Sequence, residues 1–286
     1  MPELPEVETM VRGLRPALEG RRIAALELHD PTMLQGVALD EFVTGRAGAV
    51  VARVGRRGKW VVVELAADAG IIVIQPRMTG GFRLVEPDRP EHVRLTFRLA
   101  NPDASVWYCD ARRLGRFLWF PGPEQAEAAF ARAQGPDALE IGRDDLAARL
   151  ARTRRAVKPT LLDQKVLAGI GNIYADEILF ESRLHPLRIS AELTPAEVGR
   201  LHAAIRPVLR RAIEAEGASF DAGYRTVLGL EGGFLAVNAM YGRAGLPCKN
   251  CGGPIVKTKI AGLIGRPTYL CPKCQPENRA RGRDRR

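Results

Sequence analysis

The sequence predicts a multidomain α+β protein with an N-terminal antiparallel β-sandwich and leading helix, a helical domain and a C-terminal zinc ribbon. Short runs of β-branched and aromatic residues, separated by Gly, Pro and Asp, fill residues 22–121. Residues 124–216 are instead dominated by Ala, Leu, Glu and Arg. Two Cys-x-x-Cys pairs follow near the end, and 286 residues are enough for more than one core.

The leading helix is predicted by the segment ETMVRGLRPALEG, whose apolar residues recur at helical spacing. Pro5 and the glutamates Glu3, Glu6 and Glu8 precede or open this segment. Proline and acidic residues are favoured in the first turn of a helix, where they suit the free N–H groups and the helix dipole. A short amphipathic helix is therefore expected close to the start of the chain.

The β region contains the runs WVVVEL, GIIVIQP, RLTFRL and SVWYCD. Their composition and the turn residues between them predict an antiparallel sandwich or barrel of about 100 residues. Cys109 ends the last of these runs and is expected to be a buried, inert thiol.

In the helical region, TLLDQKVLAGIGNIYADEILF predicts one helix, a tight turn and a second helix. Gly169 and Gly171 are expected to supply positive φ in the turn, and Asn172 to cap the second helix. A further helix is expected after Thr194, with Pro195 in its first position and Glu197 completing a capping box. The glycine-rich residues 217–233 then predict a loop.

Cys248, Cys251, Cys271 and Cys274 form two knuckles with the spacing of one tetrahedral zinc site. Because all four ligands would be protein thiolates, the Zn²⁺ is expected to be structural rather than catalytic. A redox or disulfide pair is the alternative, and matched knuckles in a cytoplasmic chain disfavour it. Between the knuckles, two strand-like runs predict a hairpin that carries Arg266 near its tip and that needs the zinc to fold.

The formal net charge is +10, and it is concentrated in the last 44 residues, where eleven Lys or Arg face only Glu277 and Asp284. Such a basic surface indicates a phosphate-bearing partner, although the terminal RARGRDRR is equally compatible with a solvated tail. No apolar run approaches the roughly 20 residues that span a bilayer, and the N-terminus lacks a signal-peptide pattern. A cytoplasmic location is expected.

Five separated motifs resemble the bacterial formamidopyrimidine-DNA glycosylases, a family that also contains endonuclease VIII. They are PELPEVE, RRGKW, LLDQKVLAGIGNIYADEILF, MYGRAGLPC and the terminal Cys-x-x-Cys pairs, in this order between Pro2 and Cys274. The resemblance implies a catalytic β-sandwich domain over 1–123, a helix-two-turn-helix DNA-binding domain with a lesion-recognition loop over 124–234, and a zinc finger over 235–275. Residues 276–286 would form a basic, disordered tail.

The resemblance also implies an activity: a monomeric, bifunctional DNA glycosylase and abasic-site lyase of base-excision repair. It would remove 8-oxoguanine and formamidopyrimidines from double-stranded DNA. Once Met1 is removed, Pro2 would be a secondary amine able to attack the sugar and form an iminium, which leads to β,δ-elimination. Glu3 would transfer protons and Glu6 would support it. Taken alone, the two glutamates suit a helix start equally well.

Further residues match family contacts to DNA. Lys59 and Arg266 correspond to cations beside the reacting nucleotide, although Lys59 alone would suggest an ordinary exposed lysine. Asn172, His92 and Tyr241 correspond to other phosphate contacts, and a helix N-terminus makes the physical case for Asn172. Structural roles would explain His92 and Tyr241 equally well.

Three residues match the side chains that fill the space left by a flipped nucleotide: Met78, Arg112 and Leu114. Many relatives have phenylalanine in place of Leu114, so an apolar wedge is kept while stacking is lost. Gln75, Pro76 and Arg77 also depart from the usual family sequence before Met78.

Two alternatives remain at this point. An endonuclease VIII-like enzyme would use the same chemistry on oxidised pyrimidines, and Leu114 keeps that possibility open. A non-catalytic, zinc-containing DNA-binding protein would share the basic surface and the zinc finger but not the dependence on Pro2.

Overall fold

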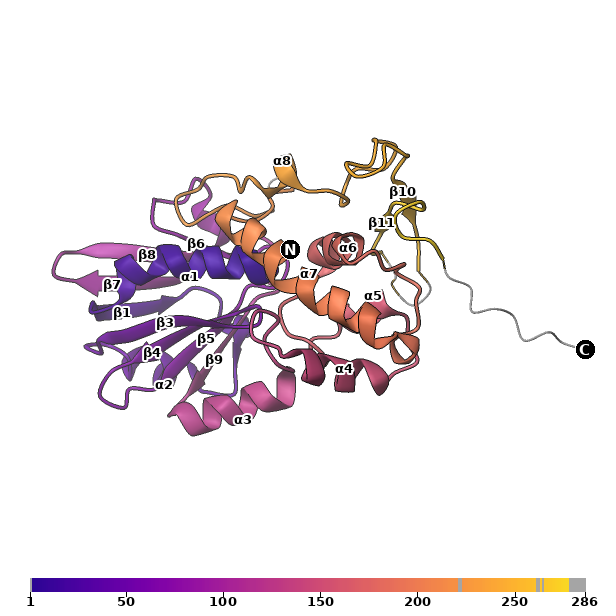
Figure 1. Cartoon of the computed structure of the whole chain (residues 1–286). Helices are drawn as coiled ribbons and strands as arrows, with labels where there is room; N and C mark the ends of the chain where they lie inside the picture. Colours follow the sequence, from indigo (N-terminus) through magenta and orange to yellow (C-terminus); the bar gives the residue numbers. More distant parts are fainter. Residues whose placement is uncertain (1, 221–222, 261–262, 264, 278–286) are drawn as a thin grey trace, which may run out of the picture. The chain divides into compact units, whose positions relative to one another are not determined.

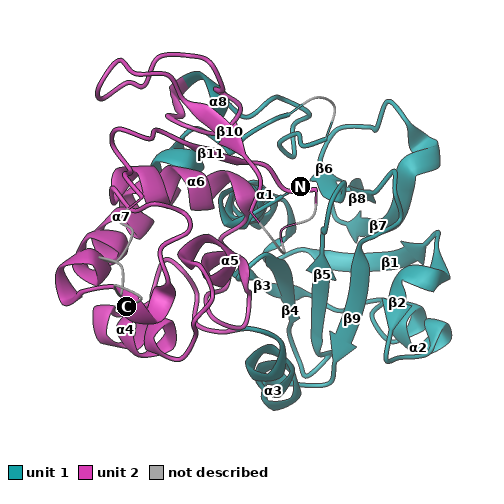
Figure 2. Ribbon diagram, turned by 90° about the vertical axis from the view of Figure 1, so that its right-hand side faces the viewer, with its two compact units in different colours: residues 1–134, 211–236 teal, residues 135–210, 237–286 magenta. Residues whose placement is uncertain are grey.

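The computed structural model describes residues 2–220, 223–260, 263 and 265–277, and the chain divides into two compact units (Figure 2). Unit 1 contains residues 1–134 and 211–236, and unit 2 contains residues 135–210 and 237–286. Met1 lies outside the described residues. So do residues 278–286, which make up most of the expected basic tail. The domain boundaries expected at residues 123, 234 and 275 stay predictions.

Unit 1 is built on two β-sheets and a leading helix (Figure 1). Its elements are α1 (Leu4–Leu18), β1 (Arg22–Leu28), β2 (Leu34–Gln35), α2 (Leu39–Thr44), β3 (Val51–Arg57), β4 (Trp60–Leu65), β5 (Ile71–Gln75), β6 (Gly81–Arg83), β7 (Val93–Ala100), β8 (Ala104–Cys109), β9 (Arg116–Phe120) and α3 (Pro123–Ala133). The strand orders are β1-β7-β8-β6 and β2-β9-β5-β4-β3. The predicted antiparallel arrangement is confirmed except that the short β2 pairs parallel with β9.

One hydrophobic core joins both sheets to α1. Val7, Met10 and Val11 of α1 pack in the same buried cluster as Ile23 of the first sheet and Ile72 of the second. The helix predicted from its apolar spacing is confirmed, and it begins at Leu4, directly after Glu3. Burial of this apolar stripe, rather than the local propensity of a 15-residue helix, holds α1 in place.

Unit 2 contains mostly helices, followed by a small hairpin. Its elements are α4 (Arg143–Ala151), α5 (Val157–Leu162), α6 (Asn172–Glu181), most of α7 (Pro195–Glu214), the last residue of α8 (Phe234–Val237), β10 (Val256–Thr258) and β11 (Thr268–Leu270). The capping box predicted for α7 is confirmed, because Thr194 N donates to Glu197 Oε2 at 2.8 Å and Glu197 N to Thr194 Oγ1 at 3.2 Å. The hairpin is antiparallel, as predicted.

The segment between α5 and α6 differs from the prediction of a long helix and a tight turn. The first helix ends at Leu162, because the Gln164 side chain bonds to the backbone of Leu162, Gly169 and Ile170 and holds the following residues in a non-helical path. Gly169 has a φ of +109°, as predicted, whereas Gly171 has a φ of −126°.

Asn172 does not cap α6, which corrects the prediction made for it. Gly171 is the N-cap residue and Asn172 is the first residue of the helix. The Asn172 side chain donates instead to the carbonyl oxygen of Pro267. No side chain caps this helix start, and the Asn172 Oδ1 accepts no hydrogen bond from the first N–H groups of α6.

The glycine-rich residues 217–233 form a loop, as expected. Its described residues hold no helix or strand apart from an isolated bridge between Ala218 and Gly233. Among the helices of the described chain, none has the length and apolarity of a membrane span.

Candidate active site and nucleic-acid interface

Pro2 and Glu3 lie at the entrance to α1, and both are buried. Glu3 is the N-cap residue and forms a capping box with Glu6, whose Oε2 accepts the Glu3 backbone N–H at 2.8 Å. The prediction that these glutamates open a helix is therefore confirmed. The same capping box fixes the Glu3 carboxyl one residue from the Pro2 nitrogen, so a role at the helix start is compatible with a role in catalysis.

Glu6 connects this helix start to the loop 217–233. Its second oxygen, Oε1, accepts the backbone N–H of Ala218 at 2.8 Å. Gly217 has a φ of +84°, and a Cβ there would lie 2.8 Å from Glu6 Oε1. Tyr224, further along the loop, is buried, and its burial together with the nearby Glu6 carboxylate raises the pKa of the phenol. One buried carboxylate thus holds both the predicted nucleophile segment and the start of the loop.

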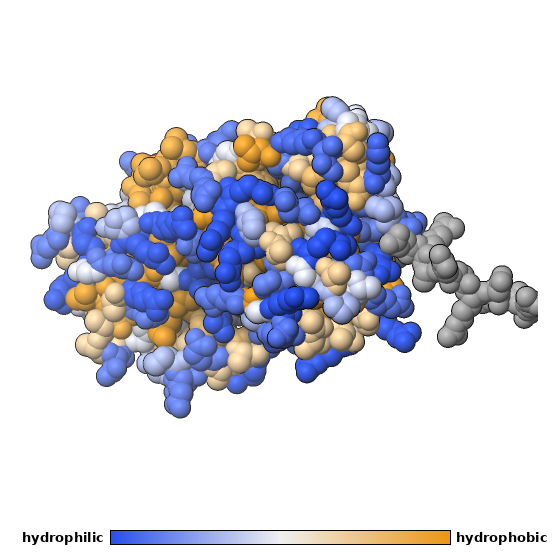
Figure 3. All heavy atoms as spheres, in the orientation of Figure 1, coloured by the Kyte–Doolittle hydropathy of each residue, from blue (hydrophilic) through white to orange (hydrophobic). Residues whose placement is uncertain are grey.

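The loop also carries exposed apolar side chains. Leu228 and Leu230 are exposed on it, and Val85 is exposed beside Gly229. Hydrophobic residues gather on the surface at the upper left of Figure 3. The loop therefore presents apolar side chains on the surface of unit 1.

Lys59 lies in the tight turn between β3 and β4 rather than within a strand, and its side chain is half-buried. Arg56 holds this turn, because its guanidinium donates to the Gly58 carbonyl at 2.8 Å and pairs with Glu8 of α1 at 3.1 Å. The turn that carries Lys59 is thereby tied to the helix that begins after Glu3.

The three residues matched to void filling lie on two turns of unit 1. Met78 is on the turn 76–80 between β5 and β6, and Arg112 and Leu114 are on the turn 110–115 between β8 and β9. Met78 and Leu114 are 38% and 41% exposed. The structure therefore brings together two turns that present apolar tips to solvent.

His92 lies in a 3-10 turn, Pro90–His92, and lines a surface pocket of about 520 Å³. Arg83, Arg89 and Arg225 line the same pocket and outnumber its one acidic residue, Asp88, so the pocket suits an anion such as phosphate. Cys109 also lines it, and is half-buried rather than buried. Burial raises the pKa of this thiol, which keeps it in the unreactive protonated form.

In unit 2, Asn172 and the hairpin residue Arg266 are joined through Pro267. The Asn172 Nδ2 donates to the Pro267 carbonyl at 3.0 Å, and Arg266, directly before Pro267, is exposed. The Asn172 side chain at the start of α6 is thus held beside the backbone that carries the Arg266 guanidinium. That combination suits an anion.

A buried ion pair, not found from sequence, supports the same stretch. Lys158 Nζ lies 2.7 Å from Asp176 Oδ1, and both side chains are fully buried. Lys158 also donates to Pro267 O at 3.0 Å and Thr268 Oγ1 at 2.9 Å, while Asp176 accepts the N–H of Tyr269. Burial raises the pKa of Asp176 to about 7, and Lys158 opposes that rise.

Tyr241 is half-buried and packs against Tyr269 with ring centroids 5.1 Å apart. The buried carboxylate of Glu177 accepts three consecutive backbone N–H groups, from residues 239, 240 and 241, at 2.8 to 2.9 Å. Glu177 therefore fixes the backbone that carries Tyr241. Glu177 belongs to the motif LLDQKVLAGIGNIYADEILF, but its hydrogen-bond partners are more than 60 residues away and are revealed only by the fold.

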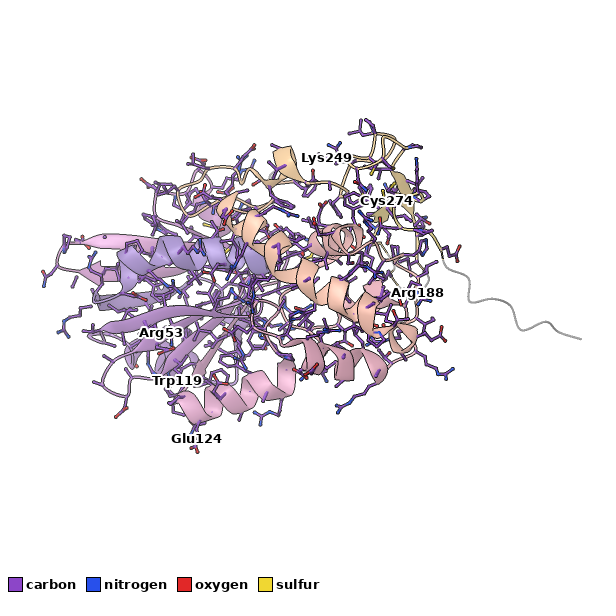
Figure 4. All side chains as sticks on the ribbon, in the orientation of Figure 1. Arg53, Trp119, Glu124, Arg188, Lys249 and Cys274 are labelled. Atoms are coloured by element: carbon purple, nitrogen blue, oxygen red, sulfur yellow. The ribbon has the colours of Figure 1, made fainter. Side chains whose placement is uncertain are left out.

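The four cysteines of the hairpin fit a zinc ion. Their Sγ atoms all lie within 4.8 Å of one another, with Cys248 and Cys274 at 3.9 Å and Cys251 and Cys271 at 3.4 Å. Tetrahedral Zn–S bonds of about 2.3 Å require S···S distances of about 3.8 Å. Asn250 donates to Cys248 and Cys274, which suits thiolates (Figure 4 labels Cys274). No disulfide joins these four cysteines in the structure, and their separations match the zinc geometry better than the S–S bond length of about 2.05 Å.

Family comparisons agree with this arrangement along the chain. The Formamidopyrimidine-DNA glycosylase N-terminal domain matches residues 1–117, and the Formamidopyrimidine-DNA glycosylase H2TH domain matches residues 133–222. The zinc finger found in FPG and IleRS matches residues 245–276, which contain all four cysteines. One structural zinc is therefore the cofactor of the hairpin.

Relatives match over nearly the full length. A formamidopyrimidine-DNA glycosylase of Symbiobacterium thermophilum is 42% identical over 96% of this chain and 90% of its own, and one of Thermus thermophilus is 40% identical over 97% and 99%. The crystal structure of MutM (Fpg) from Thermus thermophilus has a TM-score of 0.84 at 37% identity, covering 96% of this chain and 98% of that one. The Lactococcus lactis Fpg in complex with an abasic-site DNA has a TM-score of 0.87 at 30% identity, covering 96% and 100%. The chain therefore belongs to the formamidopyrimidine-DNA glycosylase family.

Proposed function

We propose that this chain is a DNA base-excision repair enzyme, a DNA-formamidopyrimidine glycosylase and abasic-site lyase that acts on oxidised purines in double-stranded DNA. The observation that carries the proposal is the buried Pro2–Glu3 pair at the start of α1, in a chain of this family. A similar solved structure, of a Lactococcus lactis Fpg mutant, contains DNA with Fapy-dG. Double-stranded DNA with a damaged base or an abasic site is the proposed partner.

The proposed reaction begins at the nitrogen of Pro2. Met1, which lies outside the described residues, is removed, and the freed secondary amine attacks the anomeric carbon of the deoxyribose. The bond to the damaged base breaks, the base leaves with a proton, and ring opening gives an iminium between Pro2 and the sugar. The Glu3 carboxyl, fixed by the capping box, supplies the proton to the ring oxygen.

The iminium then acts as an electron sink. Loss of the adjacent sugar proton expels the 3′ phosphate, and a second elimination expels the 5′ phosphate, so both flanking phosphodiester bonds break. Lys59, His92 and Tyr241 are proposed phosphate contacts in this process. Asn172 and Arg266, which like Tyr241 belong to unit 2, are proposed to act in the same way, next to Pro267.

Met78, Arg112 and Leu114 are proposed to fill the space left by the extruded nucleotide. The exposure of Met78 and Leu114 supports this role. The zinc, held by the four cysteines, is proposed to order the hairpin that carries Arg266. We further propose that the enzyme acts as a monomer at the bacterial nucleoid in the cytoplasm.

Borohydride trapping tests the proposal. The protein is mixed with duplex DNA containing 8-oxoguanine or an abasic site, reduced with borohydride, and digested for mass spectrometry. A covalent adduct on Pro2 is the expected result. Protein with a free Pro2, shown by intact mass, that gives no adduct would refute the catalytic role.

Two matched proteins separate catalysis from binding. An N-terminal tag blocks the Pro2 nitrogen, whereas a C-terminal tag leaves it free. The first should bind abasic-site DNA with the usual salt dependence and cleave none, and the second should cleave normally. Parallel assays on 8-oxoguanine and thymine glycol define the substrate class, and faster removal of thymine glycol would contradict the purine assignment.

A further inference from the structure

A buried carboxylate, Asp110, lies at the base of the two turns that carry the proposed void-filling residues. It directly follows β8 and its side chain is inaccessible to solvent. Its Oδ2 accepts the backbone N–H groups of Leu114 at 2.9 Å and Gly115 at 2.7 Å. Its Oδ1 accepts the N–H of Arg112 at 3.2 Å. One side chain therefore fixes the backbone at both Arg112 and Leu114.

The same carboxylate reaches the other turn through Thr79. The Thr79 hydroxyl donates to Asp110 Oδ1 and accepts the Arg112 N–H at 3.3 Å. Thr79 is the residue after Met78. The turns 76–80 and 110–115 are thus joined by hydrogen bonds that pass from one turn to the other.

Close packing behind the turns leaves little freedom to either of them. Tyr108 is fully buried between Phe82 and Phe117, with ring centroids 5.2 and 5.1 Å away. Its hydroxyl lies so close to Gly80 and Gly115 that a Cβ at either glycine would overlap with it. Each turn therefore has a glycine pressed on the same phenol, which fixes the distance between the two backbones.

We propose that Asp110, together with Thr79, is a positioning residue that holds Met78, Arg112 and Leu114 as one preorganised unit for insertion into the duplex. The proposal rests on the void-filling role given to those three residues under the proposed function. The three side chains are exposed, so packing against neighbouring side chains does not fix their relative positions. Those positions are set by the backbone of the two turns. Fixing it before binding lowers the ordering cost that insertion would otherwise carry.

The chemistry of the carboxylate is specific to this task. A carboxylate only accepts hydrogen bonds, and Asp110 is surrounded by three backbone N–H groups and one hydroxyl. An asparagine would turn an NH₂ group toward two of these donors and leave them unsatisfied. Asp110→Asn should therefore loosen one of the turns at nearly unchanged side-chain size.

The test compares duplex and single-stranded substrates for Asp110→Asn and Thr79→Val. In single turnover, both variants should excise 8-oxoguanine from duplex DNA about 10- to 100-fold more slowly, as misplaced groups commonly do. Cleavage at an abasic site in single-stranded DNA should stay within about twofold of the unmodified protein, since no duplex void has to be filled there. A fluorescent 2-aminopurine opposite the lesion should also report slower insertion.

Two further variants serve as controls. Thr79→Ser keeps the hydroxyl and should restore the duplex rate. Thr96→Val removes another buried hydroxyl of unit 1. Thr96 lies on β7 and its hydroxyl bonds to His29 at 2.9 Å, so this variant should leave both rates unchanged.

Each result decides the question. Wild-type duplex rates in both Asp110→Asn and Thr79→Val, or equal losses on duplex and single-stranded DNA, would overturn the positioning role. An unmodified protein that gives no borohydride adduct would instead refute the proposed function itself, so the two failures are distinguishable.

Discussion

The Glu6 carboxylate accepts the backbone N–H of Ala218 at 2.8 Å with one oxygen and that of Glu3 at 2.8 Å with the other. Gly217, the first residue of the loop, directly precedes Ala218. It has a φ of +84°, and a Cβ at this position would clash with Glu6. The loop 217–233 and the predicted nucleophile segment are therefore mechanically linked by one buried group.

Gly217→Ala should lower the rate of base excision about tenfold or more, because the added Cβ displaces Glu6 from Glu3. Gly20→Ala is the matched control: Gly20 also has a positive φ, +77°, but nothing lies within 4 Å of its Cβ position. Both variants should lose about 1 kcal/mol of unfolding free energy through the left-handed backbone. Equal excision rates in the two, measured in single turnover, would contradict the link through Glu6.

Leu114→Phe should tighten binding to a duplex with a stable abasic-site analogue, because an aromatic ring can stack on the exposed base. Stacking contributes about 1–3 kcal/mol per base, which corresponds to several-fold or more in Kd. Leu114→Ala should weaken binding, since it removes the apolar wedge. Fluorescence anisotropy at fixed salt measures both, and unchanged affinity in both variants would argue against insertion of this residue.

Removal of zinc should unfold the hairpin and leave the β-sheets of unit 1 intact. All three tryptophans, Trp60, Trp107 and Trp119, lie in unit 1, so their fluorescence reports that unit alone. Chelation should abolish hydrogen-exchange protection over 256–258 and 268–270 without moving the tryptophan unfolding transition. Cys109→Ser should still bind one zinc per chain, whereas Cys248→Ser should not.

Acid should weaken the attachment of the turn 110–115. The Arg113 guanidinium, bonded to Asp30 at 2.5 Å, holds the pKa of that carboxyl below its ordinary value of 3.8. A depressed folded-state pKa means that the stabilising contribution is complete above the ordinary pKa and is lost as the pH falls through the folded value. Asp30→Asn should therefore lower the unfolding free energy at pH 5 and make less difference near pH 3.

Urea unfolding at several pH values measures this effect. Glu27→Gln, which removes a more exposed partner of Arg98, provides the control. A difference between Asp30→Asn and the unmodified protein that grows as the pH falls would contradict the assigned direction.

Local features of the sequence predicted local structure well. Thr194, Pro195 and Glu197 define the start of α7 because a capping box involves residues only three apart. The cysteine knuckles likewise specify the zinc site by spacing. The end of α5 at Leu162 was not predictable in this way, because the Gln164 amide overrides a sequence that otherwise favours a helix.

Interactions between distant residues were the ones that sequence could not supply. Asp110 reaches Thr79 across 31 positions, and Glu177 reaches Ala239 across 62. Nothing in the neighbourhood of either acid in the sequence indicates these distant partners. The parallel pairing of β2 with β9 was missed for the same reason, because two residues carry too little pattern to show register.

The two-part composition of unit 1 also has a consequence for the order of events during synthesis. Residues 1–134 leave the ribosome first, but the segment 211–236 that completes the unit follows only after unit 2 has begun to emerge. Until then the Ala218 N–H is not available to Glu6, so the contact between α1 and the loop 217–233 forms late. Unit 1 therefore completes its fold only after the chain of unit 2 between residues 135 and 210 has been synthesised, so the folding of the two units is coupled in time.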